Sequence, residues 1–218
     1  MRKPHSDYPA YARSERIADG TIHALGLLFA LTGATGLIVW SAVHAGAGHI
    51  AALSVYGAAL IATFAASAFY HMTPWERLRP WLRRVDHAAI YLKIAGTVTP
   101  LAVLLGTPFA YTVMAAVWTL AAVGMVKKLF FWQVPGRFGP ALYLVMGWMG
   151  ALLLVAGWSV WPGASLALIA VGGLLYTGGV VFFSWESLKF SNAIWHGFVV
   201  AASVCFFAAI GLATAHAI

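Results

Sequence analysis

Two short motifs place polar side chains at helical spacing within an otherwise apolar chain. Ser67 and His71 are four residues apart at the end of one apolar run, and Asn192 and His196 repeat that spacing far downstream. Residues four apart lie on one face of a helix. Each pair is therefore expected to present its two polar groups in the same direction.

Further ionisable residues stand close to these motifs in the expected arrangement of helices. The dipeptide Asp86-His87 opens the apolar run that follows His71, after a short Arg-rich loop. Near the N-terminus, a third set is again spaced four apart, Glu15, Asp19 and His23. Ionisable groups at membrane depth are costly and usually mark a functional site. The sequence thus predicts one polar cluster at one end of a set of helices.

The residue types in this cluster suit metal chemistry. Neutral imidazole nitrogens and carboxylate oxygens are the usual ligands of a catalytic zinc ion, which keeps an open position for water. Bound zinc turns that water into a nucleophile near neutral pH. A neighbouring carboxylate could orient the water or act as its base, and a serine hydroxyl could steady a ligand or polarise a substrate carbonyl.

Other interpretations of the same residues remain open from spacing alone. A histidine in a membrane helix often bonds only to a neighbouring helix. Asp86 could form an interfacial ion pair with Arg83 or Arg84, and Lys93, two turns further on, could snorkel inward or pair with Asp86. The acidic residues near the N-terminus could simply stabilise a helix start.

The composition identifies the environment of these motifs. The chain has 218 residues, of which 62% are hydrophobic and only 9% charged, and its mean hydropathy is +0.85. A soluble domain carries about 25% charged residues. Such an apolar chain is expected to be an integral membrane protein, with no indication of nucleic acid as a partner.

Apolar runs long enough to span a bilayer predict an all-α bundle of seven transmembrane helices. A polar tail covers residues 1–16, and a single domain covers 17–218. The expected spans lie at about Ile17–Ser41, Ile50–Met72, Val85–Gly106, Phe109–Val126, Pro140–Gly157, Ala164–Ser184 and Asn192–Ala215.

The distribution of Lys and Arg predicts the orientation. Twelve of the thirteen fall in the N-terminal tail and in the loops after the second, fourth and sixth spans, whereas Lys93 lies inside the third. Cytoplasmic loops carry the excess of Lys and Arg. The N-terminus and the polar cluster are therefore expected on the cytoplasmic side and the C-terminus outside, with anionic lipid headgroups as partners of the basic loops.

Taken together, the motifs resemble the hemolysin III family, the bacterial branch related to the progestin and adiponectin receptors and, more distantly, to alkaline ceramidases. The resemblance covers nearly the whole chain, in order. It rests on Glu15-x-x-x-Asp19-x-x-x-His23-x-x-Gly26, Ser67-x-x-x-His71, Asp86-His87-Ala88-Ala89-Ile90-Tyr91, Ile94-Ala95-Gly96-Thr97-x-Thr99-Pro100, Tyr143-x-x-Met146-Gly147-Trp148 and Ala193-Ile194-Trp195-His196-Gly197-Phe198-Val199.

The resemblance implies a multi-pass protein of a bacterial inner membrane with a zinc site near its cytoplasmic face. It implies His71, His196 and Asp86 as metal ligands, and Asp86 with Ser67 as the catalytic pair if the protein is an enzyme. His23, Asp19, Glu15 and His87 are expected in the second shell or the same cluster.

This sequence departs from the family pattern at two positions in its last span. The family motif is His-x-x-x-His, but Asn192 stands in the first position, and a later histidine is replaced by Phe206. Asparagine is a weak zinc ligand compared with imidazole. The resemblance therefore implies a zinc site that is weak or absent unless another residue completes it.

Three functions follow as hypotheses. The first is a membrane sensor or homeostasis protein whose polar or zinc site holds helices together, which the substitution at Asn192 favours. The second is a zinc-dependent intramembrane hydrolase of lipid amides or esters. A pore-forming cytolysin ranks last, because the span pattern is typical of a resident membrane protein.

Overall fold

The computed structural model describes residues 11–132, 138–185 and 187–218, and this part of the chain is all-helical. Arg2 and Lys3 of the predicted tail, the turn at residues 135–137 and Glu186 lie outside the described residues. The helices are α1 (Arg13–His44), α2 (Ala47–Met72), α3 (Arg79–Leu105), α4 (Pro108–Phe130), α5 (Phe138–Ala156), α6 (Gly163–Phe183) and α7 (Ser191–Ala217).

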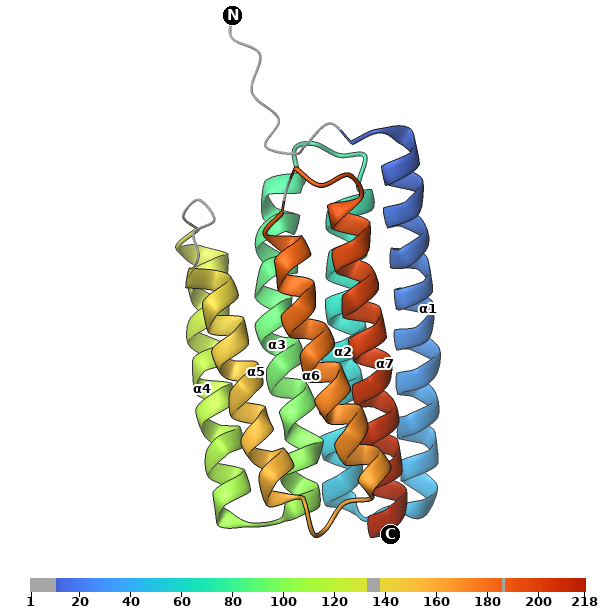
Figure 1. The fold of residues 1–218 in the computed structure, drawn as a ribbon, viewed down its shortest axis with the longest axis vertical. Helices are drawn as coiled ribbons and strands as arrows, with labels where there is room; N and C mark the ends of the chain where they lie inside the picture. Colours follow the sequence, from blue (N-terminus) through green and yellow to red (C-terminus); the bar gives the residue numbers. More distant parts are fainter. Residues whose placement is uncertain (1–10, 133–137, 186) are drawn as a thin grey trace, which may run out of the picture.

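The helices run side by side along the long axis, with successive helices in opposite directions (Figure 1). Helix α3 is central, because it packs against α2, α4, α5 and α7. Helix α1 packs against α2 and α7, and α6 packs mainly against α7. The first and last helices of the chain are therefore neighbours.

The surface of the bundle is apolar. Six helices are long and apolar enough to cross a membrane, and α5 contains a shorter apolar stretch, Ala141–Ala156. Large apolar side chains point outward on several helices, including Leu28 (59% exposed), Leu174 (63%) and Val155 (75%). Exposed apolar surface on this scale marks a lipid-facing or protein-binding surface.

The basic residues gather at one end of the bundle. The start of α1, the α2–α3 turn, the end of α4 and the α6–α7 turn all lie at the upper end in Figure 1. They carry the described arginines and lysines other than Lys93, namely Arg13, Arg16, Arg77, Arg79, Arg83, Arg84, Lys127, Lys128 and Lys189.

Helix α3 begins earlier than the sequence predicts. The expected start at Val85 is wrong, because the structure begins α3 at Arg79 and follows a loop of six residues, Thr73–Leu78. Pro80 lies in the first turn, where a missing N–H costs nothing, and the Arg79 guanidinium donates to the Thr73 carbonyl at 2.8 Å. Asp86 therefore lies two turns inside α3 rather than at its first residue.

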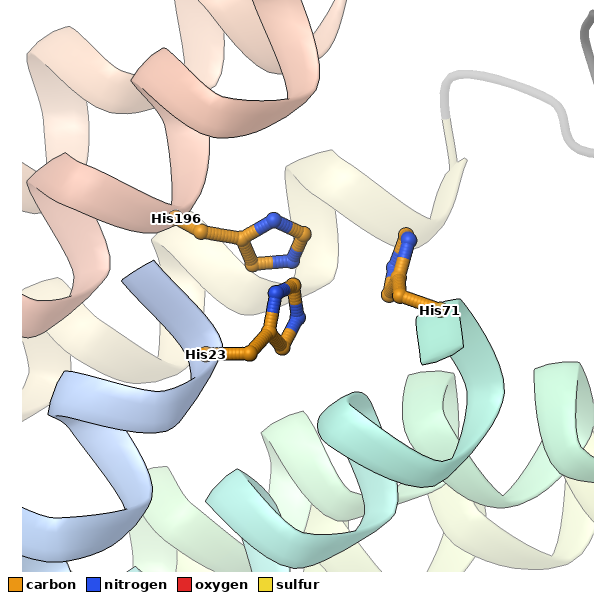
Figure 2. A group of neighbouring side chains, drawn as sticks. All are labelled: His23, His71 and His196. Carbon is orange, nitrogen blue, oxygen red and sulfur yellow. The ribbon is translucent and has the colours of Figure 1, made fainter. Parts of the chain in front are cut away.

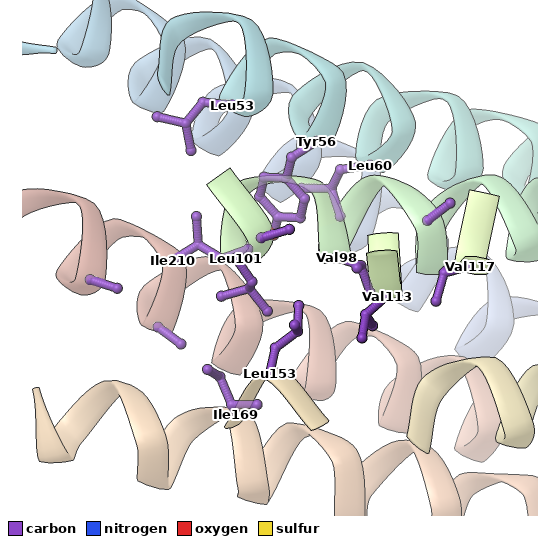
Figure 3. Packing of buried hydrophobic residues seen from close by; sticks show 14 of the residues in the cluster. Leu53, Tyr56, Leu60, Val98, Leu101, Val113, Val117, Leu153, Ile169 and Ile210 are labelled. Carbon is purple, nitrogen blue, oxygen red and sulfur yellow. The ribbon is translucent and has the colours of Figure 1, made fainter. Parts of the chain in front are cut away.

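Figure 3 shows the apolar core between the two ends of the bundle. Leu60 of α2, Leu101 of α3, Leu153 of α5 and Ile210 of α7 are each at most 2% exposed. Helices α2 and α3 approach most closely where Gly96 faces Ala59, because a Cβ added at Gly96 would lie 2.5 Å from the Ala59 Cβ. Thr63 also donates across this contact to the Ala89 carbonyl at 3.0 Å.

This close approach predicts that Gly96→Ala destabilises the bundle. The added methyl group has no room without moving α2 away from α3, and overpacking of this kind costs about 1–3 kcal/mol. Thermal unfolding in detergent micelles should show a clear loss. Gly147→Ala is the matched control, because a Cβ there meets nothing within 4 Å. Equal melting of the two variants would contradict the packing described.

Candidate metal centre

The polar residues meet at the basic end because four helix termini meet there. Helices α1, α3 and α7 begin at this end and α2 ends at it. Asp19 and His23 lie on one face of α1, His71 in the last turn of α2, and His196 in the second turn of α7. Residues 177 positions apart in the sequence thus become direct neighbours.

Three imidazole rings form the centre of this cluster (Figure 2). One ring nitrogen from each of His23, His71 and His196 lies within 4.8 Å of the other two. The ring centroids are 4.2 Å apart for His23 and His196, 4.6 Å for His71 and His196, and 4.9 Å for His23 and His71. His23 and His196 are buried, and His71 is partly buried.

The Asp19 carboxylate orients the rings. Its Oδ1 atom accepts from Nδ1 of His196 at 3.0 Å and lies 3.4 Å from Nδ1 of His23, whose ring also donates to the Asp19 carbonyl at 2.8 Å. The other carboxylate oxygen lies 3.6 Å from Nδ1 of His71. A carboxylate or carbonyl on the far nitrogen is the usual partner of a metal-ligating histidine, because it fixes the ring and the tautomer.

A count of protons shows that the cluster suits a cation. With both Nδ1 atoms donating toward Asp19, the Nε2 atoms of His23 and His196 are acceptors, and both face the Ser67 hydroxyl, at 3.1 and 3.3 Å. One hydroxyl proton can satisfy only one of them. The second lone pair therefore has no proton, and a metal ion between the rings would supply the missing positive charge.

The distances also fit, with a modest closure. Zinc–nitrogen bonds of about 2.0–2.1 Å in a tetrahedral site separate ligand nitrogens by roughly 3.3 Å. The three nitrogens here lie within 4.8 Å of one another. Small rotations of the rings would bring them to bonding positions, so these histidines could hold a zinc ion.

Asn192 takes part in this site in an unexpected way. Its amide nitrogen lies 3.1 Å from Nδ1 of His71, so it donates to that ring. The same Nδ1 atom faces Asp19. Asn192 thus bonds the ring nitrogen of His71 that also faces Asp19, and it holds this ring through an amide N–H.

The remaining predicted residues lie around the cluster in distinct places. Asp86 is buried and in polar contact with Ser67, outside the three-histidine group. His87 turns toward the segment that follows α4, where its ring packs edge-on against Trp132, with the ring centroids 5.3 Å apart. Glu15 joins α1 to the α6–α7 turn, since its carboxylate accepts from the backbone N–H of Phe190 at 2.9 Å.

The sequence interpretation therefore named every member of the cluster but not its centre. The structure brings His23 into the group of three nitrogens, whereas the sequence interpretation expected it in the second shell or the same cluster, and it leaves Asp86 beside Ser67. The i, i+4 spacing of Asp19 and His23 on α1 was the available signal. What the spacing could not show is that α1 packs against α7.

A small cleft at the basic end reaches the edge of the cluster at Asp19 and His71. Its lining also includes Glu15, Phe190 and Asn192.

Comparison with known proteins gives one family. The family model described as "Haemolysin-III related" matches residues 11–207. The chain is 33% identical over 195 residues to the "Hemolysin-3 homolog" of Bacillus subtilis (strain 168), covering 88% of this chain and 91% of that protein. It is 34% identical to "Hemolysin-3" of Bacillus cereus over 194 residues, covering 88% and 89%.

A relative outside bacteria is also similar. The human protein "Monocyte to macrophage differentiation factor" is 32% identical over 166 residues, which covers 72% of this chain and 67% of that protein. The shared region includes most of the bundle.

The role of Asp19 can be tested without reference to any metal. Asp19→Ala removes both carboxylate oxygens, so the buried Nδ1–H of His196 loses its acceptor. The expected destabilisation is about 1–3 kcal/mol, measured by thermal unfolding. Glu76→Ala, in the exposed α2–α3 loop, is the matched control. Asp19→Ala melting at the control's temperature would refute the carboxylate's role.

Proposed function

The chain belongs to the haemolysin-III-related family, and from this premise we propose that it is a zinc-binding membrane sensor or homeostasis protein. His23, His71 and His196 hold the ion, with Asp19 as their common partner. The observation that carries the proposal is the convergence of three imidazoles from three helices, with one proton too few to satisfy them. A bound zinc ion would supply charge neutralisation and a link between α1, α2 and α7.

A sensing role follows from where the ligands lie. Each histidine belongs to a different helix near its end, so occupancy by metal would fix the relative positions of three helix ends. Metal that binds only the folded arrangement stabilises it in proportion to its concentration. The availability of zinc would then determine how the helix ends are arranged at the basic end. A cytoplasmic partner or a lipid headgroup could respond to that arrangement.

We further propose seven transmembrane spans in a bacterial plasma membrane, with the N-terminus cytoplasmic and the C-terminus outside. The gathering of basic residues at one end supports this orientation. In this orientation the cleft and the cluster would lie at the cytoplasmic face. Anionic headgroups are the proposed partners of the same basic loops.

The orientation has a direct test. A reporter fused after Ile218 should be active outside the cytoplasm, and one inserted in the Thr73–Leu78 loop should be active inside it. The reverse pattern would overturn the placement of the cluster at the cytoplasmic face.

The central experiment is metal analysis combined with substitution of Asn192. The purified wild-type chain should contain zinc that a chelator removes, with a fall in melting temperature. Asn192→His adds a strong ligand beside His71, so zinc should bind at least about tenfold more tightly. Saturation at a hundredfold excess over Kd would stabilise the fold by about 2.7 kcal/mol.

Asn192→Ala is the control for this experiment. It removes the amide and adds no ligand, so its zinc affinity should not exceed that of the wild type. His23→Ala should abolish the chelator-sensitive part of the melting temperature. Retention of zinc by His23→Ala would contradict the proposed ligand set.

A second candidate function is a zinc-dependent hydrolase of lipid amides or esters. It is favoured by one observation, the buried Asp86 carboxylate in polar contact with Ser67 at the edge of the three-histidine group. Asp86 could act as base toward a water, and Ser67 could position a substrate carbonyl. Zinc-loaded protein that hydrolyses a ceramide-like amide, and loses this activity but not its zinc in Asp86→Asn, would favour this function over sensing.

Pore formation is the least favoured function. It rests only on the names of the two Bacillus relatives. Leakage of liposomes caused by the purified chain, and absent with an unrelated multi-pass protein, would be needed to support it.

A further inference from the structure

A second polar group lies deep in the bundle, apart from the histidine cluster. Lys93 stands in the middle of α3, seven residues beyond Asp86, and is only 6% exposed. Seven residues of helix correspond to about 10 Å along the axis. The Lys93 ammonium donates to the Ser203 hydroxyl of α7 at 2.6 Å, so it neither snorkels to the basic end nor pairs with Asp86.

Aromatic rings enclose the rest of the ammonium group. Its nitrogen lies 4.7 Å from the centre of the Phe64 ring and 5.2 Å from the centre of the Tyr176 ring. Ring faces attract cations, so this arrangement suits a charged amine with one hydrogen bond and two aromatic contacts. Of these residues only Tyr176 is partly exposed, while Phe64 and Ser203 are buried.

The charge on Lys93 has no counter-charge within the described part of the chain. No carboxylate there lies within 4.0 Å of its nitrogen, since the described ion pairs involve only Asp19 and Asp86 with histidines. A buried charge without a partner is strongly unfavourable in an apolar interior, and in membrane helices such residues pair or mark a ligand path. An anion from outside the chain would remove this cost.

The donors still available here belong to Lys93. Ser203 has no proton to offer, because it donates to the Val199 carbonyl and accepts from Lys93 and from the Tyr176 hydroxyl at 3.0 Å. The Lys93 ammonium carries three N–H groups, and one of them bonds Ser203. The remaining N–H groups fit a ligand that only accepts.

We propose that Lys93, Phe64 and Tyr176 form a binding site for a monovalent anion, a halide or the carboxylate of a single-chain amphiphile. The ammonium neutralises the anion and donates its remaining N–H groups to it, and the rings of Phe64 and Tyr176 supply an apolar wall. Entry is past Tyr176 on α6, because this is the exposed side of the group. The site is independent of the histidine cluster and does not require metal.

The test is an anion-dependent melting curve of the purified full chain in neutral detergent. One series replaces gluconate by chloride at constant ionic strength, and a second adds sodium octanoate below its micelle-forming concentration. The wild type should show a saturable rise in melting temperature. Lys93→Met should show none, with an affinity at least about tenfold lower, and in gluconate it should melt at or above the wild type.

Lys128→Met is the matched control, since Lys128 lies over Trp132 at the basic end and its loss should leave the anion response unchanged. A response to chloride would assign a halide, and a response only to octanoate would assign a carboxylate amphiphile. If Lys93→Met does not fold, Lys93→Gln keeps a hydrogen-bond donor for Ser203 without the charge, and it should also show no response. No saturable shift in the wild type, or an equal shift in a Lys93 variant, overturns the proposal.

Discussion

The polar end of this bundle depends on a single carboxylate. Asp19 is buried between α1 and α7, and its two oxygens face the rings of His23, His196 and His71. In an apolar environment no water replaces a lost hydrogen-bond partner. The buried carboxylate therefore fixes the positions of the rings that bond to it. Its position determines the tautomers of His23 and His196 and the direction of their free lone pairs. The shortage of protons at Ser67 follows from these tautomers.

Much of the fold could be predicted from the sequence, because a bilayer allows few alternatives. Apolar length fixes the helices, and backbone groups in lipid must bond within their own helix. The Gly106-Thr107-Pro108 turn shows this clearly, since Gly106 adopts φ +62° and the Thr107 hydroxyl caps α4 by accepting from the Ala110 N–H at 3.2 Å. The start of α3 was less predictable, because Arg79, Arg83 and Arg84 read as loop residues yet belong to a helix that continues beyond the apolar run.

The candidate site was predictable in membership but not in geometry. Spacing along one helix shows which side chains share a face, as it does for Asp19 and His23, but not which helices are neighbours. The packing of α1 against α7 brings His23 toward His196. The direction of Lys93 was equally inaccessible to spacing, because its choice of Ser203 over Asp86 depends on how α3 and α7 are rotated toward each other.

The contacts between α1 and α7 also constrain how the protein can be made. Glu15 accepts from the backbone N–H of Phe190, a residue in the left-handed conformation at φ 63°, and Asp19 accepts from His196, so α1 is completed only by contacts around the start of α7. During insertion, Asp19 must wait without its His196 partner, which lies 177 positions further along the chain. The polar cluster can therefore form only after α7 has been inserted, so a chain that stops before α7 leaves the Asp19 carboxylate without the His196 N–H.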